Sequence, residues 1–213
     1  MTSKADADEI AAFARGLASK LSLRGQRASW PLHLFRVDDV RAAASILNRG
    51  VLYPRSRAER AGLLTHDSAA PGVIEHTPDW CKDCVRLYFR PRTPTEYRSE
   101  GFRPRDQITM RAHRPVPVVF VFDSLPIITA PGTTFTEGNA STKGCRRGED
   151  LAFLNTIPFD KVYHDTWISD DERDVVFRRC AEVLVANELA LTHVKHVFCR
   201  SQAEYETLYS LLA

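Results

Sequence analysis

Apolar positions recur along the chain with two different periods, which predict both helices and strands. From Ile10 to Leu21 they recur every three or four residues, and acidic residues precede them where a helix dipole favours negative charge. We therefore expect a helix over residues 5–20. Short runs rich in aromatic and β-branched residues predict strands. These runs are residues 29–37, 85–89, 116–122, 177–185 and 194–199.

Two further helices are expected between and after these runs. Asp38 or Asp39 can cap a helix that Gly50 ends, and residues 202–212 predict a closing helix. Residues 55–79 and 126–162 lack a clear period, so we expect them to be mostly loops. The pattern predicts an α+β fold. Residues 1–28 are expected to form an N-terminal helical extension, and residues 29–213 the domain proper.

Composition narrows the class of protein without deciding its function. The hydrophobic share of 44% and the charged share of 26% are typical of a soluble globular protein. No apolar run approaches the roughly 18 residues that a membrane span requires, so we expect no membrane contact. The five cysteines, an odd number, favour a reduced, cytoplasmic compartment. The chain lacks the glycine-rich phosphate loops that would support a Rossmann or P-loop fold.

Glu182 is the most unusual residue of the predicted strands. Period-two alternation places it on the same side as Cys180 and Leu184, among residues typical of a core. An unpaired carboxylate is costly to bury, so it is expected at an ion pair, a metal or a functional cleft. Arg178 or Arg179 could supply the ion pair. A Glu182 that is salt-bridged and inaccessible would argue against a catalytic role.

Four stretches carry a resemblance to a known family. Residues 33–40 read H-L-F-R-V-D-D-V, residues 83–94 D-C-V-R-L-Y-F-R-P-R-T-P, residues 135–140 F-T-E-G-N-A and residues 178–185 R-R-C-A-E-V-L-V. In this order they resemble the motifs H-x-x-H-I-D-N-L, D-Y-V-P-F-Y-F-x-P-R-S-P, F-T-D-G-N-A and R-R-Q-A-E-F-L-V. These motifs belong to the DarT-type DNA ADP-ribosyltransferases, the toxin half of a bacterial toxin–antitoxin pair. The resemblance implies a split β-sandwich, in which two twisted sheets surround an NAD cleft.

The resemblance also implies roles for individual residues. ADP-ribosyl transfer from NAD breaks the bond between nicotinamide and ribose through a cationic transition state. The carboxylate of Glu182 would stabilise that charge and accept a proton from the attacking base. His33 would hydrogen-bond the ribose on the adenosine side, and Tyr88 would pack on the nicotinamide. Phe35 and Arg36 complete the predicted NAD-binding set.

The family also has a functional arginine in the segment before its second motif. Arg55, Arg57 and Arg60 occupy that segment here, and we choose Arg60, although the spacing does not decide among them. Two further positions depart from the motifs. Arg36 stands where the family often has a second histidine, and Arg86 stands in place of a proline.

Basic residues are concentrated between residues 86 and 114, with aromatic residues among them. This pattern fits a groove in which the bases of single-stranded nucleic acid stack on aromatic rings, and a solvated basic face is the alternative. Residues 136–147 are the candidate specificity loop. The predicted substrate-binding residues are Arg92, Thr136, Asn139, Arg146 and Arg178.

The expected acceptor is a base of single-stranded DNA, and the family implies an antitoxin partner of macrodomain type. RNA or a protein acceptor is the first alternative, and a non-catalytic nucleic-acid-binding module is the second. Cys81 and Cys84 form a lone CxxC, which His66 and His76 would have to complete as a zinc site. No second CxxC exists, so we expect no metal.

Overall fold

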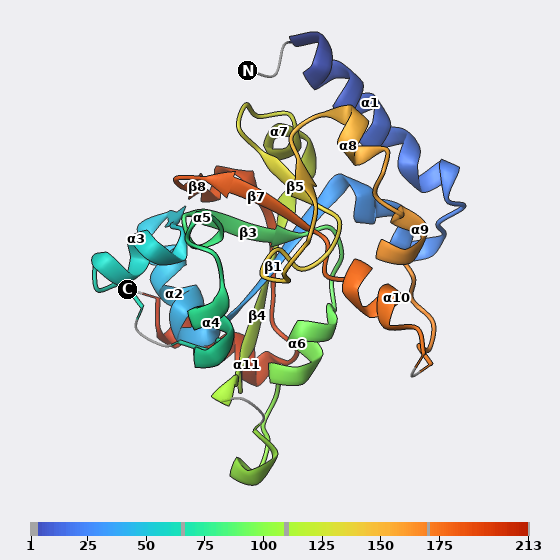
Figure 1. Cartoon of the computed structure of the whole chain (residues 1–213). Coiled ribbons are helices and arrows are strands. Elements are labelled where there is room, and N and C mark those ends of the chain that lie inside the picture. The colour runs from blue at the N-terminus through green and yellow to red at the C-terminus, as the bar shows by residue number, and fades with distance from the viewer. Residues whose placement is uncertain (1–3, 65–66, 109–110, 170, 213) are drawn as a thin grey trace.

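The structure is a computed structural model that describes residues 4–64, 67–108, 111–169 and 171–212. Figure 1 shows its elements in chain order. The α-helices are α1 (Lys4–Lys20), α2 (Val40–Arg49), α3 (Arg55–Arg60), α4 (Pro71–His76), α5 (Asp79–Lys82), α6 (Pro94–Ser99), α7 (Ser124–Ile128), α8 (Leu151–Leu154), α9 (Phe159–Val162), α10 (Arg173–Arg178) and α11 (Gln202–Ser210). The 3-10 helices are η1 (Gly25–Leu32), η2 (Arg105–Gln107) and η4 (Leu191–His193). The strands are β1 (His33–Asp39), β2 (Val51–Leu52), β3 (Cys84–Tyr88), β4 (Pro117–Asp123), β5 (Thr134–Thr136), β6 (Arg147–Gly148), β7 (Glu182–Ala186), β8 (Leu189–Ala190) and β9 (Val194–Phe198).

The large sheet has seven strands in the order β6-β5-β7-β3-β1-β4-β9, all paired antiparallel. β1 pairs with β4 over its whole length, and β3 pairs with β7 from Cys84 to Tyr88. In contrast, β1 and β3 meet at Phe35↔Tyr88 and then diverge. The sheet therefore consists of two twisted halves that join at one point, and Figure 1 shows β3 running in a different direction from β1 and β4.

A second, two-stranded sheet pairs β2 with β8. The described strands form no closed barrel. The predicted α+β fold with two twisted sheets around a cleft is confirmed, because the two halves of the large sheet provide the split.

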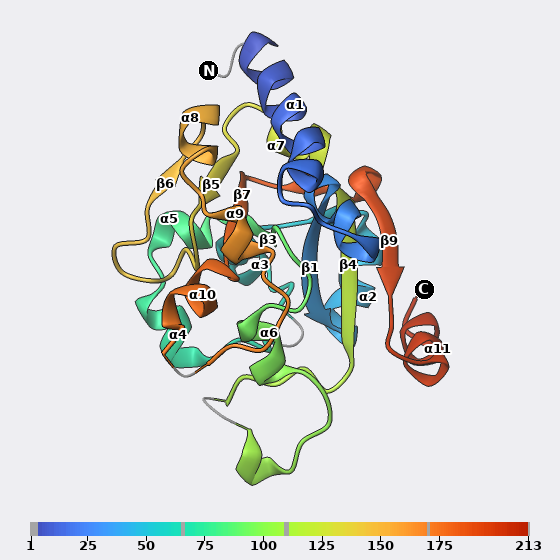
Figure 2. The same ribbon diagram turned by 90° about the vertical axis from the view of Figure 1, so that its right-hand side faces the viewer.

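One hydrophobic core joins α1 to the sheet. Ile10, Ala14 and Leu17 are buried in the same cluster as Phe120 and Phe122 of β4. α1 lies against α7 and α8 at one end of the sheet (Figures 1 and 2). The boundary at residue 28 stays a prediction, and η1 crosses it. Among the described residues, no helix has the length and apolar character needed to cross a bilayer.

Local signals gave several elements correctly. The Asp39 side chain accepts from the backbone N–H of Arg41 and caps α2, which ends at Gly50 with a φ of 69°. This left-handed conformation favours glycine. The expected helices at residues 5–20 and 202–212 correspond to α1 and α11.

Other boundaries differ from the predictions. The expected strand at residues 177–185 begins only at Glu182, because Phe177 and Arg178 end helix α10. The first strand begins at His33 instead of residue 29, since Trp30 and Pro31 belong to η1. The two expected loops contain short helices and strands, including α3, α4 and α5 over residues 55–79. Such short elements have too few residues to show a period.

Candidate active site

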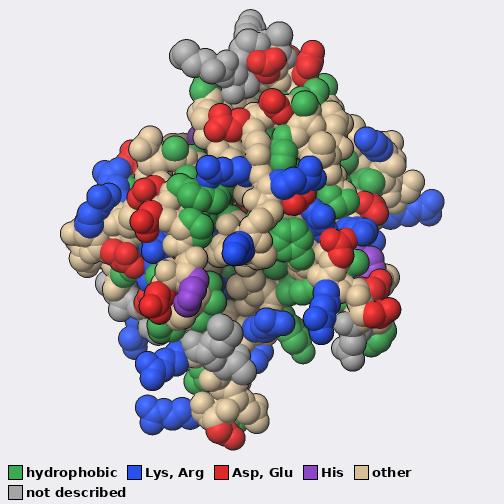
Figure 3. Space-filling model, in the orientation of Figure 1, with side chains coloured by type: hydrophobic (Ala, Val, Ile, Leu, Met, Phe, Trp, Pro, Cys, Tyr) green, Lys and Arg blue, Asp and Glu red, His purple; other side chains and the backbone are tan. Residues whose placement is uncertain are grey.

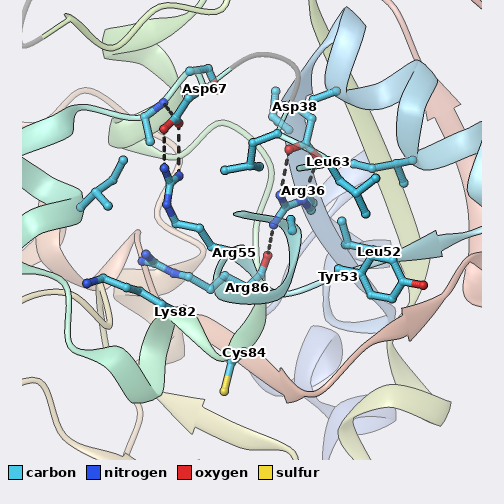
Figure 4. Close-up of a pocket in the computed structure, with 18 of the residues that line it drawn as sticks. Arg36, Asp38, Leu52, Tyr53, Arg55, Leu63, Asp67, Lys82, Cys84 and Arg86 are labelled. Carbon is cyan, nitrogen blue, oxygen red and sulfur yellow. Dashed lines mark hydrogen bonds and ion pairs between the residues drawn. The ribbon is translucent and has the colours of Figure 1, made fainter. Parts of the chain in front are cut away.

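A cavity of about 220 Å³ lies where β1 and β3 diverge. Arg36 and Asp38 of β1 line one side, and Arg86 and Tyr88 of β3 line the other. Residues of α3, α4 and α5 close it from outside (Figure 4). The Nη1 of Arg36 donates to the backbone carbonyl of Arg86 at 3.3 Å, so a side chain bridges the strands where their ladder has opened.

The cavity is rich in positive charge. Its basic lining residues are Arg36, Arg49, Arg55, Lys82, Arg86 and Arg114. Arg36 pairs with Asp38 at 2.7 Å and Arg55 pairs with Asp67 (Figure 4). Arg55 also pairs with Glu59. Because six cations face fewer carboxylates, the cavity suits an anionic ligand, and arginine offers a bidentate fork for phosphate.

Strand register places four of the predicted residues on one face of the sheet. Tyr88 lies opposite Phe35 on β1 and opposite Glu182 on β7. Residues directly opposite in an antiparallel pair share a face, and alternation adds His33 to the same face as Phe35. Burial, followed by the nearby Glu182 charge, raises the pKa of Tyr88, so its hydroxyl stays neutral.

Glu182 is fully buried and fully paired. Its side chain has 0% exposure, and its two carboxylate oxygens accept from Nε and Nη2 of Arg86 at 2.6 and 2.7 Å. The backbone N–H of Ala140 donates to the same carboxylate at 3.0 Å. The predicted alternative partners pair with other acids: Arg178 with Glu137 and Asp174, and Arg179 with Asp165. In this conformation the carboxylate is salt-bridged and does not line the cavity, which is the outcome that argues against a catalytic role. The catalytic role of Glu182 therefore stays a proposal.

The comparisons with known proteins address the chain as a whole. A family model described as "DarT: ssDNA thymidine ADP-ribosyltransferase" matches residues 35–213. The chain belongs to the DarT family. The predicted resemblance and enzyme class are confirmed, and the family description narrows the acceptor base to thymidine. No curated protein matches the chain.

Solved DarT structures share the fold at low sequence identity. Thermus sp. 2.9 DarT in complex with carba-NAD+ has 15% identity and a TM-score of 0.66, covering 85% of this chain and 88% of that one. The same protein in complex with ADP-ribosylated ssDNA has 16% identity and a TM-score of 0.68, covering 85% and 87%. Thermosipho africanus DarTG in complex with ADP-ribose has 16% identity and a TM-score of 0.65, covering 84% of this chain and 46% of that one.

The choice of the DarT-family arginine stays a prediction, and the structure favours Arg55 over Arg60. Arg60 is exposed and does not line the cavity, whereas Arg55 does. The two lie on one helix, and five residues turn a helix by roughly 500°, so their side chains point roughly 140° apart. The helix α3 was not expected from the sequence, and without it the three arginines could not be told apart.

The remaining NAD-binding predictions, His33 and Phe35, do not line the cavity. Phe35 is 6% exposed, and the ring of His33 stands 6.4 Å from it. The Nδ1 of His33 is 2.9 Å from the backbone carbonyl of Ser29. Their contact with NAD stays a prediction, while Arg36 and Tyr88 line the cavity directly.

The predicted specificity loop is tied to Glu182 instead of standing free. Thr136 is fully buried, where its hydroxyl accepts from the backbone N–H of Glu182 at 3.1 Å and donates to Gly138 O. It therefore positions the strand and is closed to substrate in this conformation. Asn139 is half-buried, and its Oδ1 accepts from Arg86 at 3.1 Å.

The predicted substrate arginines do not converge on one point. Arg146 and Arg178 both pair with Glu137, at 2.7 and 2.8 Å. Arg92 is exposed, with a φ of 57°. Figure 3 shows basic side chains across the middle and lower part of one face, interspersed with acidic ones. Phe89 and Arg90 belong to the basic and aromatic stretch that predicted a nucleic-acid surface. Both are buried and cannot contribute to such a surface.

The structure adds two residues that sequence reasoning missed. The sequence predicted Arg86 as a departure from the motif and as part of the basic stretch, but not as the partner of Glu182, because a pairing across 96 residues leaves no local signal. Gly138 packs against the ring of Phe177, where a Cβ would come within 2.3 Å of the ring.

The CxxC pair shows no sign of a metal site in the part of the chain that the structure describes. Burial raises the pKa of the Cys81 thiol to about 11. Among the described residues no group of three acids, histidines or cysteines could hold a metal, and His66 lies outside them.

Proposed function

We propose that this chain transfers ADP-ribose from NAD to thymidine in single-stranded DNA and releases nicotinamide. Membership of the DarT family supports the reaction class. The observation that carries the assignment to this site is the pairing of Tyr88 with Glu182 beside a cation-rich cavity at the split of the sheet. Related DarT structures contain NAD+ and ADP-ribosylated ssDNA.

Each residue of the site has a role that follows from its charge and its position. Once released from its pair with Arg86, Glu182 would face the developing positive charge on the ribose, and the ring of Tyr88 would form the wall against nicotinamide. Arg36 and Arg55 hold the pyrophosphate, because both guanidinium groups line the cavity. The cavity of about 220 Å³ is smaller than the roughly 300–1,000 Å³ typical of ligand pockets. It therefore receives part of NAD, and the rest requires side-chain movement.

Single-stranded DNA would approach along the residues between α6 and β4, which flank the cavity through Arg114. Tyr97 in α6 and Phe102 after it are 74% and 79% exposed, and Arg98, Arg103 and Arg105 lie beside them in the sequence. Exposed rings with neighbouring arginines suit base stacking and phosphate contact.

Two further proposals concern the setting of the enzyme. A macrodomain-type antitoxin is proposed as partner. The supporting relative is DarTG from Thermosipho africanus, a longer chain of which the match covers 46% and whose structure contains ADP-ribose. A cytoplasmic location is proposed because all five cysteines are unpaired in the structure.

The test uses NAD with thymidine-containing single-stranded DNA, the same DNA without thymidine, and RNA, each read by mass spectrometry. We expect the wild type to add ADP-ribose to the first oligonucleotide alone. Glu182→Gln should lower the rate at least about 100-fold, whereas Glu188→Gln, which removes an exposed partner of Arg57, should not. Unchanged activity in Glu182→Gln would remove the proposed mechanism, and modified RNA would favour the alternative acceptor.

A matched pair of variants tests whether Arg55 or Arg60 is the DarT-family arginine. Arg55→Gln should raise the KM for NAD, since it removes a cation from the cavity, and Arg60→Gln should leave it unchanged. The reverse result would restore Arg60.

A further inference from the structure

Arg86 stands between the cavity and the carboxylate of Glu182. The Arg86 side chain is 25% exposed and lines the cavity, while that of Glu182 is 0% exposed and does not. Figure 4 shows the Arg86 side chain extended along the cavity beside Arg55. A substrate in the cavity therefore meets the guanidinium group before it can meet the carboxylate.

The contact neutralises the group that the reaction needs. Two charge-assisted hydrogen bonds, at 2.6 and 2.7 Å, join Arg86 to Glu182 in a bidentate pair. A carboxylate stabilises a cationic transition state through its negative charge, and a guanidinium group at this distance cancels most of that charge. The described conformation is therefore a resting one with respect to Glu182.

The same guanidinium group is bound to the candidate specificity loop. Its Nη1 donates to the hydroxyl of Ser141 at 3.0 Å, and its Nη2 donates to Oδ1 of Asn139 at 3.1 Å. Between these two residues, the backbone N–H of Ala140 donates to Glu182 itself. Three consecutive loop residues thus hold the ion pair, and a displacement of the loop loosens both of its members.

The root of the loop is fixed by charge and packing contacts, so a displacement by DNA would fall on its tip, where Ala140 is buried and the hydroxyl of Thr77 donates to that of Ser141. Glu137 is clamped by Arg146 and Arg178, and Gly138 lies against the ring of Phe177. Beyond this point Asn139 and Ser141 are only half-buried. The adjoining cavity gives the Arg86 side chain room to turn, and a substrate phosphate would offer it another anion.

We propose that Arg86 is a positioning residue that keeps Glu182 neutralised until single-stranded DNA displaces residues 139–141. The inference rests on the proposed function and concerns the regulation of its site. Its consequence is that NAD is protected from hydrolysis in the absence of DNA. In hydrolysis the bond between C1′ of the ribose and the nicotinamide nitrogen breaks, and nicotinamide leaves with the electron pair. Water bonds to C1′ and gives up one proton.

The experiment measures nicotinamide release from NAD without DNA and with thymidine-containing single-stranded DNA. In Arg86→Gln we expect the rate without DNA to rise roughly tenfold, which reflects the loss of a charged hydrogen-bonded pair. The stimulation by DNA should fall by a similar factor. Arg86→Lys keeps the charge without the bidentate fork and should lie between. Arg200→Gln, which breaks another arginine–glutamate pair outside the cavity lining, is the matched control for the rate without DNA and should release nicotinamide as the wild type does.

A rise in rate distinguishes the proposal from a merely structural role, because damage to the site only lowers rates. If Arg86→Gln folds but releases nicotinamide no faster than the wild type, the proposal is wrong. Should Arg86→Gln not fold, Ser141→Ala decides in its place, with an expected rise of about two- to threefold and an unchanged rate as the contrary outcome. A wild type that modifies DNA keeps the proposed function in either case. A wild type that consumes no NAD under any condition removes that function, and this inference with it.

Discussion

Two arginines near the cavity, Arg86 in β3 and Arg90 just after it, show how the same residue type acquires different roles. Arg90 has a side-chain exposure of 1% and donates mainly to backbone carbonyls, those of Pro91, Val162 and His164. Arg86 is 25% exposed and donates to side chains, those of Glu182, Asn139 and Ser141.

The difference lies in what the partners can do. Backbone carbonyls of packed segments cannot rotate away, so Arg90 fixes the turn after α9 to the end of β3. Carboxylate, amide and hydroxyl groups can exchange partners when a loop moves, and a cavity beside Arg86 leaves it space. We infer that Arg90 is structural, whereas Arg86 is free to change partners.

The largest expected effect is on the free energy of unfolding, which should fall much more when Arg90 is replaced than when Arg86 is replaced. Arg90→Gln should lower the free energy of unfolding by about 3–5 kcal/mol, because it leaves buried carbonyls and Asp165 without their donor. Arg86→Gln should cost about 1–2 kcal/mol, since water from the cavity can hydrate Glu182. Chemical denaturation of both variants makes the measurement. Equal losses would contradict the distinction.

Glu96 is a buried carboxyl group that, unlike Glu182, has no bidentate arginine partner within the described ranges. It tests how such a group affects the free energy of unfolding. It is 3% exposed, its Oε2 accepts from Thr93 N–H at 2.9 Å, and its Oε1 has no hydrogen-bond partner among the described residues. Burial raises the pKa of Glu96 from 4.5 to about 7. The folded state therefore holds a proton that the unfolded state releases between these values, and stability should fall as pH rises through that window.

The expected loss between pH 4.5 and pH 7.5 is about 3 kcal/mol for this one group. Glu96→Gln keeps a side chain that can cap α6 and should flatten this part of the profile. Denaturation curves of both proteins at half-unit pH steps give the difference. Parallel profiles would show that Glu96 does not titrate in this range.

Gly138→Ala tests the fixed root of the loop that binds Arg86. A Cβ there would meet the Phe177 ring at 2.3 Å, so the ring or the loop must move. We expect a loss of about 1–3 kcal/mol in stability, together with reduced DNA modification. Gly72→Ala, where a Cβ meets nothing within 4 Å, is the control. An active, fully stable Gly138→Ala would show that the loop root tolerates displacement.

The smallest effect is expected at Arg36, a cavity arginine whose acid is local. It pairs with Asp38 two residues away, and its side chain is 26% exposed. Arg36→Gln should change stability by about 1 kcal/mol or less, while weakening NAD binding. Isothermal titration with NAD measures the second effect, and unchanged affinity would remove Arg36 from the pyrophosphate site.

The sequence by itself determined what depends on near neighbours. The helix end at Gly50 and the terminal helices follow from residues within a few positions and were predicted, as was a cap at Asp38 or Asp39, of which the structure uses Asp39. The four motifs gave the family, and alternation placed Glu182 on a strand face with Leu184. The error at Phe177 also has a local cause, since a short amphipathic helix and a strand both show buried apolar residues.

Only the tertiary structure decided which charges meet. Arg86 and Glu182 are 96 residues apart, and their contact depends on the pairing of β3 with β7. Arg55 reaches the cavity and Arg60 does not, because α3 turns them to different sides. Local patterns fix helices, caps and faces, since those depend on a few bonds. The partner of a buried charge depends on how distant segments pack, and in this chain that packing closes the carboxylate on which the proposed reaction depends.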